Sequence, residues 1–254
     1  MITINGHDNG ATLVASLNSN FAETIAAPDT TARARIIEDF TGGGLANGAP
    51  YALSNSGSGS GYDGTIASES SHPGVAQLST GTTTTGYAFM ATKSASAVVF
   101  GADAWTVRII FQLPDLSDGT DTYTFIAGFG DAPTAASQTD GAFIRYTHSV
   151  NSGKFQAVTE SNTTETATDT GVTVAADTWY RLDIAVNAAG TSVTFTIKTA
   201  TADPVLVATN TTNIPTTATR ATGIICGLIK SAGTTARTAW VDLIDASATF
   251  GTAR

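Results

Sequence analysis

Acidic side chains come first among the residues that could do chemistry here, because hydrolysis of a glycosidic bond needs two facing carboxyl groups. None of the five glutamates belongs to an alternating Glu-x-Asp-x-Glu strand pattern. Glu38 and Asp39 are adjacent, so they would point to opposite faces of a strand. The sequence therefore predicts no catalytic residue and no enzyme. The glutamates are Glu23, Glu38, Glu69, Glu160 and Glu165.

Three aspartates in one short loop form the candidate metal site. Asp115, Asp118 and Asp121 lie in the segment PDLSDGTDTY, and carboxylate oxygens are ligands that Ca²⁺ accepts. Their spacing differs from the D-x-D-x-D-G pattern of calcium loops, and Asp-Gly at 118–119 is also typical of a tight turn. Calcium is the one cofactor that the sequence suggests, with a plain turn as the alternative.

The other residues that could act as nucleophiles or bases are isolated. His7, His72 and His148 are scattered, and no serine stands at the centre of a G-x-S-x-G motif. We interpret the histidines as turn or surface residues, since SSHPGV is a natural turn entering a strand. Cys226 lies in GIICGLIK and is expected to be a buried small hydrophobe. GSGYDG at 59–64 fits G-x-G-x-x-G, but no strand leads in and no helix follows.

A sugar site would combine exposed aromatic rings with hydrogen-bonding side chains. Candidates for both exist, but the tryptophans lie at the starts of predicted strands or within them, so core or rim packing is the alternative. The sequence alone assigns no glycan site. The candidates are Trp105, Tyr146, Trp179 and Trp240, with Arg108, Arg145 and Arg181 nearby in the sequence.

The balance of charge limits the possible partners. The chain of 254 residues has 12 Lys and Arg against 21 Asp and Glu, a formal net charge of −9. Nucleic acid is a poor partner, because phosphate recognition needs clustered Lys and Arg. Only 13% of the residues are charged, against about 25% in typical domains, so Thr, Ser, Asn and Gly must build the surface.

No segment predicts a signal peptide or membrane insertion. The N-terminus MITINGHDNG lacks a basic region followed by an apolar one. No run of about 18 apolar residues is present, so the sequence predicts no transmembrane helix.

One N-terminal segment has helical periodicity. Leu13, Leu17, Phe21 and Ile25 are spaced four apart, which places them on one stripe of a helix that Pro28 ends. A helix of about 16 residues is marginal alone in water, so its stripe must dock on the body or on a partner. We expect residues 1–35 to form an anchoring arm.

From residue 36 onward the apolar period is two, which predicts an antiparallel β-sandwich over 36–254. About a dozen strands are expected, and the Gly/Ser-rich segment 55–64 is expected to be an exposed loop. Tyr180, Leu182, Ile184 and Val186 share one face of a strand. The same alternation holds for Trp105, Val107, Ile109, Phe111 and Leu113, and for Val193, Phe195 and Ile197.

Several segments resemble the concanavalin A-like (laminin-G-like) jelly-roll domains of tailed-phage virion proteins. They include IIEDFTGGG, WTVRIIFQLPDLSDGTDTYTFIAGFGDA, AADTWYRLDIAVNAAGTSVTFTI and KSAGTTARTAWVDLIDASATF, and the resemblance spans roughly 36–250. The arm segment LNSNFAETIAA is similar to the starts of phage fibre proteins. The resemblance implies two antiparallel sheets of six to seven strands, with the first and last strands adjacent.

The resemblance also implies a location and a set of partners for the protein. We expect a non-enzymatic virion structural protein, made in the host cytoplasm and displayed on the particle exterior. Its partners would be capsid or tail proteins and further copies of itself in a homo-oligomer. A capsid decoration (cement) protein is favoured, because the chain has no repeat that would build a fibre shaft. The alternative is a short tail fibre or receptor-binding module for host-surface glycan, and a polysaccharide-degrading enzyme is the third reading.

Overall fold

The computed structural model describes residues 33–41, 51–58, 60–65, 71–92, 96–199 and 205–251. The predicted arm helix, with Leu13, Leu17, Phe21 and Ile25, lies outside these residues. All structural statements below concern the described part of the chain.

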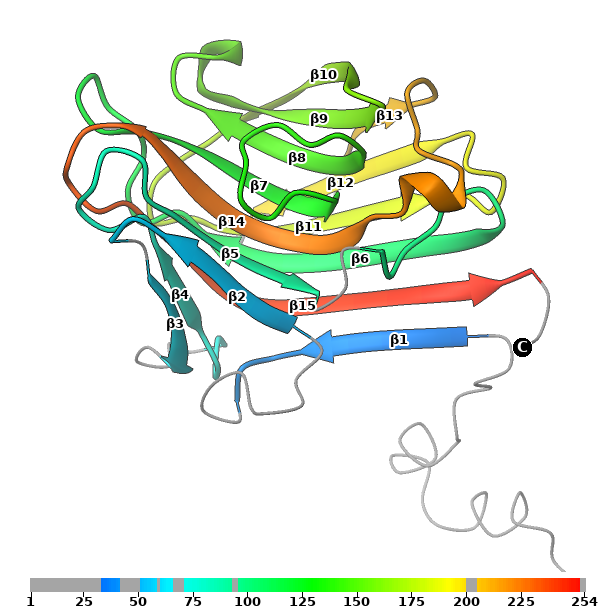
Figure 1. Ribbon diagram of the computed structural model, residues 1–254, viewed down its shortest axis with the longest axis horizontal. Coiled ribbons are helices and arrows are strands. Elements are labelled where there is room, and N and C mark those ends of the chain that lie inside the picture. The colour runs from blue at the N-terminus through cyan, green and yellow to red at the C-terminus, as the bar shows by residue number, and fades with distance from the viewer. Residues whose placement is uncertain are drawn as a thin grey trace, which may run out of the picture.

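The described residues form an all-β sandwich of two antiparallel sheets, which confirms the expected fold class (Figure 1). Sheet A has eight strands, in the order β13-β12-β11-β6-β15-β4-β3, and β1 also pairs with β15. Its strands are β1 (Arg33–Glu38), β3 (Ser60–Thr65), β4 (Ala76–Ser79), β6 (Asp103–Gln112), β11 (Trp179–Val186), β12 (Val193–Thr199), β13 (Val205–Asn210) and β15 (Thr238–Phe250).

Sheet B has seven strands, in the order β10-β9-β8-β7-β14-β5-β2. Two single-turn 3₁₀ helices, η1 (Asn151–Gly153) and η2 (Ala218–Arg220), lie in the connections. The strands are β2 (Tyr51–Ser56), β5 (Tyr87–Thr92), β7 (Thr122–Gly130), β8 (Gly141–Thr147), β9 (Lys154–Ser161), β10 (Thr164–Thr173) and β14 (Gly223–Ala232).

The first and last described strands are neighbours, as the resemblance implied. β1 runs antiparallel to β15 with Arg33 opposite Thr249 and Glu38 opposite Ile244. Figure 1 shows β1 beside the long β15 along one side of the sandwich. The chain therefore enters and leaves the sandwich on the same edge of sheet A.

Apolar and polar residues alternate along the strands, and the apolar ones form the core between the two sheets. In β11 the inward residues Tyr180, Leu182, Ile184 and Val186 are buried, while the residues between them are partly exposed. Phe111 on β6 is fully buried and packs against the rings of Phe125, Phe155 and Tyr180, with centroids 4.7, 6.0 and 5.7 Å away. Cys226 is also fully buried, as expected, and its burial raises the pKa of its thiol.

A second apolar cluster lies on the outer face of sheet B. The loop 131–140 approaches this cluster at Ile225. A Cβ added to Gly130 would meet both Ile225 and the side chain of Gln138 from that loop. The buried members are Phe89, Ala91, Ile126, Phe143, Val158 and Ile225.

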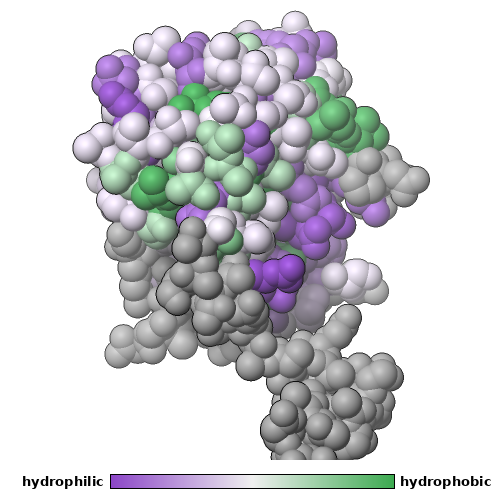
Figure 2. All heavy atoms as spheres, turned by 90° about the vertical axis from the view of Figure 1, so that its right-hand side faces the viewer, coloured by the Kyte–Doolittle hydropathy of each residue, from purple (hydrophilic) through white to green (hydrophobic). Residues whose placement is uncertain are grey.

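The surface agrees with the low charge content. Figure 2 shows one end of the sandwich, where pale, weakly polar residues predominate and strongly hydrophilic ones are interspersed. Residues of intermediate hydropathy thus cover much of this face, with hydrophobic residues also visible among them.

Two sequence predictions about strands are wrong. Residues 55–64 were expected to be one exposed loop, yet they contain the end of β2 and most of β3. Gly57, at φ 70°, makes the turn between them, and a Cβ there would meet Thr83. All but the end of the Thr-rich strand β10 was also missed, because its earlier residues include few apolar ones. Neither strand needs an apolar face, because β3 is held by backbone pairing with β4 and β10 by backbone pairing with β9.

Replacing Phe111 with Ala should lower the free energy of unfolding by about 3–5 kcal/mol, because it removes a fully buried ring at the centre of the core. Chemical denaturation followed by tryptophan fluorescence measures the change. Val150→Ala is the control, since Val150 is 41% exposed and its loss should cost less than about 0.5 kcal/mol. Equal effects of the two variants would contradict this account of the core.

Candidate functional site

The outer face of sheet A carries its polar side chains in cross-strand rows. Opposite residues in an antiparallel pair lie on the same face, so the register defines each row. The first row is Gln77, Trp240, Gln112 and Trp179, on β4, β15, β6 and β11. The second is Leu243, Ile110, Arg181 and Lys198, and the third is Asp245, Arg108, Asp183 and Thr196.

Arginines hold the carboxylates of the third row. Asp183 accepts hydrogen bonds from Arg108 Nε and Arg181 Nε, both at 2.7 Å. Asp245 accepts two bonds from Arg35 of β1, at 2.8 and 2.9 Å. These carboxylates are therefore engaged and are poorly placed to act as an acid or base.

A groove of about 850 Å³ runs over this row. Arg33 and Arg35 line it from β1, and Thr106 and Ser247, whose hydroxyls lie 2.8 Å apart, line it from β6 and β15. The groove is thus polar and open, with charged groups of both signs in its walls.

Next to it lies a site formed by His72, Asp242 and Trp179. The register of β15 shifts between Val241 and Leu243, and Asp242 is the extra residue of this bulge. His72 Nδ1 lies 2.9 Å from Asp242 Oδ2, and the imidazole stacks on Trp179 with centroids 4.0 Å apart and planes at 14°. His72 therefore bridges from β15 to β11 across β6. Its Nε2 forms no hydrogen bond with the described residues.

Asp242 is only 8% exposed, and burial raises the pKa of its carboxyl, although the hydrogen bond with His72 acts in the opposite direction. The hydrogen bond between this carboxyl and Nδ1 orients the imidazole. Beside Asp242 in the sheet, Gln112 is 5% exposed, and its Oε1 has no hydrogen-bond partner among the described residues.

A second cavity, of about 430 Å³, opens beside this stack. His72 and Trp179 form one wall, Ile110 of β6 also lines the cavity, and Arg181 and Lys198 bring two cations to it. The cavity therefore combines an aromatic wall, an apolar residue and positive charge.

The structure brings together only part of the predicted sugar-site residues. Trp179, Trp240, Arg108 and Arg181 share the outer face of sheet A. Trp105 is 7% exposed and donates its indole N–H to the Val99 carbonyl, so it packs at the rim of the core.

Two further candidates lie on the other sheet. Tyr146 is buried against Tyr123, with ring centroids 5.6 Å apart. Arg145 of β8 donates to Gln156 on the neighbouring strand β9 and pairs with Glu165 on β10, one strand further along sheet B. Neither Tyr146 nor Arg145 lines either cavity.

Sequence reasoning missed His72, Asp242 and Lys198. His72 and Asp242 are 170 positions apart, and no local pattern signals their contact. The alternation of Trp179, Arg181 and Asp183 was the one usable signal, because it places these three side chains on one face.

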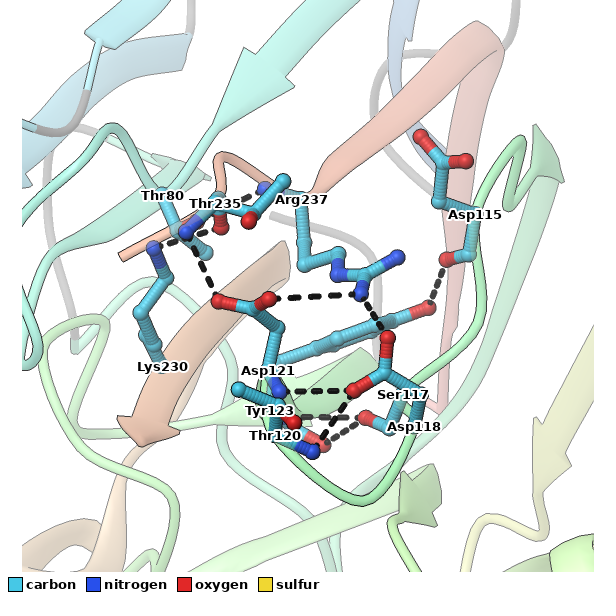
Figure 3. A network of polar contacts seen from close by, with 10 residues as sticks. All are labelled: Thr80, Asp115, Ser117, Asp118, Thr120, Asp121, Tyr123, Lys230, Thr235 and Arg237. Carbon is cyan, nitrogen blue, oxygen red and sulfur yellow. Dashed lines mark hydrogen bonds and ion pairs between the residues drawn. The ribbon is translucent and has the colours of Figure 1, made fainter. Parts of the chain in front are cut away.

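The three candidate calcium ligands do not form a common site. Asp118 accepts from the backbone N–H groups of Thr120 and Asp121, both at 2.7 Å, and Asp121 accepts from the N–H of Thr235. Figure 3 shows Arg237 between the carboxylates of Asp118 and Asp121, while the Asp115 carboxylate points away from both. Among the described residues, no three His, Cys, Asp or Glu side chains are arranged to hold a metal ion.

The polar groups of this loop instead stabilise the ends of two strands. Lys230, only 3% exposed, donates from Nζ to the carbonyls of Gly81 and Thr235, and its burial lowers its pKa. Hydrogen bonds from backbone N–H groups lower the pKa values of Asp118 and Asp121. The carboxylates are therefore stabilised as acceptors by their own loops.

Glu160 and Glu165 face each other on sheet B, directly opposite in the pairing of β9 and β10. Glu160 is 4% exposed, and its Oε2 has no hydrogen-bond partner among the described residues. Burial, and then the nearby charge of Glu165, raise the pKa of Glu160. Arg145 holds Glu165, and neither glutamate lines the groove or the cavity.

The sandwich has the concanavalin A-like fold, and solved structures with that fold are similar to it. Peanut lectin aligns with a TM-score of 0.53 and 8% identity over 87% of this chain and 99% of the lectin. The endo-1,3-beta-glucanase of Streptomyces sioyaensis aligns with a TM-score of 0.53 and 14% identity over 87% and 98%.

The sequence itself shows the family to which the chain belongs. Residues 71–242 match the model of the SO2946-like, C-terminal domain family, and the chain belongs to this family. The protein of unknown function SO2946 from Shewanella oneidensis MR-1 aligns with a TM-score of 0.64 and 17% identity over 99% of each chain. No curated protein matches the sequence significantly.

These similarities do not test the expected place on a phage particle. The similar proteins named above include no virion protein, so that expectation stays a prediction from the sequence resemblance. The helices of the described residues include none long and apolar enough to span a membrane.

Asp121→Asn should lower stability at neutral pH, because the bonds from Thr235 favour the ionised carboxyl in the folded state. The folded pKa lies below the ordinary value of 3.8, so this stabilisation is present above 3.8 and is lost as the pH falls through the folded pKa. Urea titrations over a pH series should show the difference from wild type shrinking in acid. A constant difference would contradict the assignment.

Glu160→Gln should raise the free energy of unfolding by about 1 kcal/mol at neutral pH, because it replaces a carboxylate whose charge is disfavoured by burial and by Glu165 with a neutral amide. The folded pKa is raised, so the gain should vanish below the ordinary value of 4.5, where the carboxyl is protonated in both states. Glu165→Gln is the matched control and should not stabilise, since it breaks the ion pair with Arg145. Equal melting temperatures for both variants would refute the assignment.

Proposed function

We propose that this protein is a non-catalytic carbohydrate-binding module and that its binding surface is the outer face of sheet A. The observation that carries the proposal is the cavity beside Trp179. There an indole, an imidazole fixed by Asp242 and two cations surround a space of about 430 Å³. Ligand sites of this kind combine apolar and aromatic walls with a few oriented polar groups.

The rows of the sheet extend this surface. Trp240 lies in the same row as Trp179, two strands away, which corresponds to about 10 Å. That distance is comparable to the length of a short oligosaccharide. The adjoining groove of about 850 Å³ lies over the hydroxyl and charged rows and gives room for further sugar units.

The state of the carboxylates supports binding over hydrolysis. Asp183 and Asp245 are held by arginines, and Asp242 is held by His72. A glycosidase needs one carboxyl free to donate a proton and another free to attack or to activate water. Similar folds include both a lectin and a glucanase, so the fold by itself does not decide between these functions.

Trp179→Ala should weaken glycan binding by about 2 kcal/mol, or about 30-fold, because it removes the aromatic wall. A glycan array identifies the ligand, and isothermal titration calorimetry measures the affinity. Tyr87→Ala is the matched control, since Tyr87 belongs to the apolar cluster on the outer face of sheet B. Circular dichroism confirms that both variants are folded.

Two outcomes would contradict the proposal. Binding that survives Trp179→Ala unchanged would move the site elsewhere on the molecule. Release of reducing ends from the bound polysaccharide would show a catalytic protein.

A further inference from the structure

The outer face of sheet A is more basic than the chain as a whole. Among the side chains that the structure describes, this face carries five Lys and Arg residues but three Asp and Glu residues. An acidic protein thus gathers positive charge on one face. The cations are Arg33, Arg35, Arg108, Arg181 and Lys198, and the carboxylates are Asp183, Asp242 and Asp245.

The ion pairs of this face leave positive charge unmatched. Asp183 is shared by Arg108 and Arg181, so one carboxylate serves two guanidinium groups. Arg33 and Lys198 form no ion pair with the described residues. Asp242 is already held by His72.

The arrangement of Arg181 and Lys198 is the most specific feature. They lie directly opposite each other in the pairing of β11 and β12, and both line the cavity beside Trp179. Like charges directly opposite on neighbouring strands destabilise a sheet. An anion between them would remove that repulsion.

We propose that this cavity binds the acidic group of a sugar. A carboxylate or sulfate carried by a saccharide lies between Arg181 and Lys198, while the sugar ring packs against Trp179 and Ile110. The imidazole of His72, with Nε2 free of partners among the described residues, lies in the same wall. This inference rests on the proposed carbohydrate-binding function and names its ligand class.

An acidic saccharide fits the charges of the chain better than nucleic acid does. Duplex DNA carries one charge for about every 1.7 Å, and a chain with a net charge of −9 repels such a dense polyanion. A saccharide with one acidic group per sugar or per disaccharide carries well-separated charges. One pair of cations can bind one such charge.

Matched polymers test the inference on the whole protein. Polygalacturonate is compared with its methyl ester, and dextran sulfate with dextran, by calorimetry at low and high salt. We expect the acidic member of at least one pair to bind about tenfold more tightly, with a preference that weakens as salt rises. The pair that shows the preference distinguishes a carboxylate ligand from a sulfate ligand.

Lys198→Gln tests the cavity itself. It should weaken binding of the acidic polymer far more than binding of the neutral polymer, and so remove most of the preference for the acidic one. Lys154→Gln is the matched control, because Lys154 lies on sheet B and pairs with Asp169. It should change neither affinity.

Each other result overturns the inference. If neutral and acidic polymers bind with equal affinity and Lys198→Gln changes neither affinity, the proposed acidic ligand is wrong. The proposed carbohydrate-binding function would still stand. Equal effects of the two lysine variants would show diffuse attraction rather than this cavity. No binding of any glycan in the array would remove the proposed function and the inference with it.

Discussion

Antiparallel pairing of β6 with both β11 and β15 is the constraint on which the rest of this structure depends. Side chains alternate between the two faces of a strand, so a slip of one residue would exchange the inner and outer sets completely. In the observed register Phe111 and Ile109 enter the core, while Arg108 and Ile110 face outward. The buried aromatic cluster around Phe111 holds this register, and the register in turn builds the polar rows.

The polar rows show how one sheet can carry a charged surface in a protein that has few charges. Of the outer-face aspartates whose side chains the structure describes, Asp183 and Asp245 have arginine partners and Asp242 has a histidine, which lowers the cost of placing carboxylates on a half-buried surface. None of these three carboxylates is left without a partner. The cavity beside Trp179 lies where the aromatic row meets the basic one.

The parts of the fold that could be predicted are those with an apolar face. The alternating segments of β6, β11 and β12 were recognised because each buries one side in the core. β3 and most of β10 were not recognised, since backbone hydrogen bonds to neighbouring strands support them and leave little trace in hydropathy. His72 was interpreted as a turn or surface residue, but it is held between Asp242 and Trp179. The calcium hypothesis did not foresee Arg237, which lies between two of the three aspartates.

The sequence by itself determined the all-β class, the inward and outward faces of the main strands and the burial of Cys226. Each of these follows from periodicity and hydropathy, which depend on residues that are close together in the sequence. Only the tertiary structure decided which outward residues meet. Strand order in a sandwich joins segments far apart in the chain, as the 170 positions between His72 and Asp242 show. A bulge at Asp242 and the register of β12 against β11 then place the imidazole, Arg181 and Lys198 around one cavity. No local pattern carries that information, because it depends on pairings that form when the two sheets close over a common core.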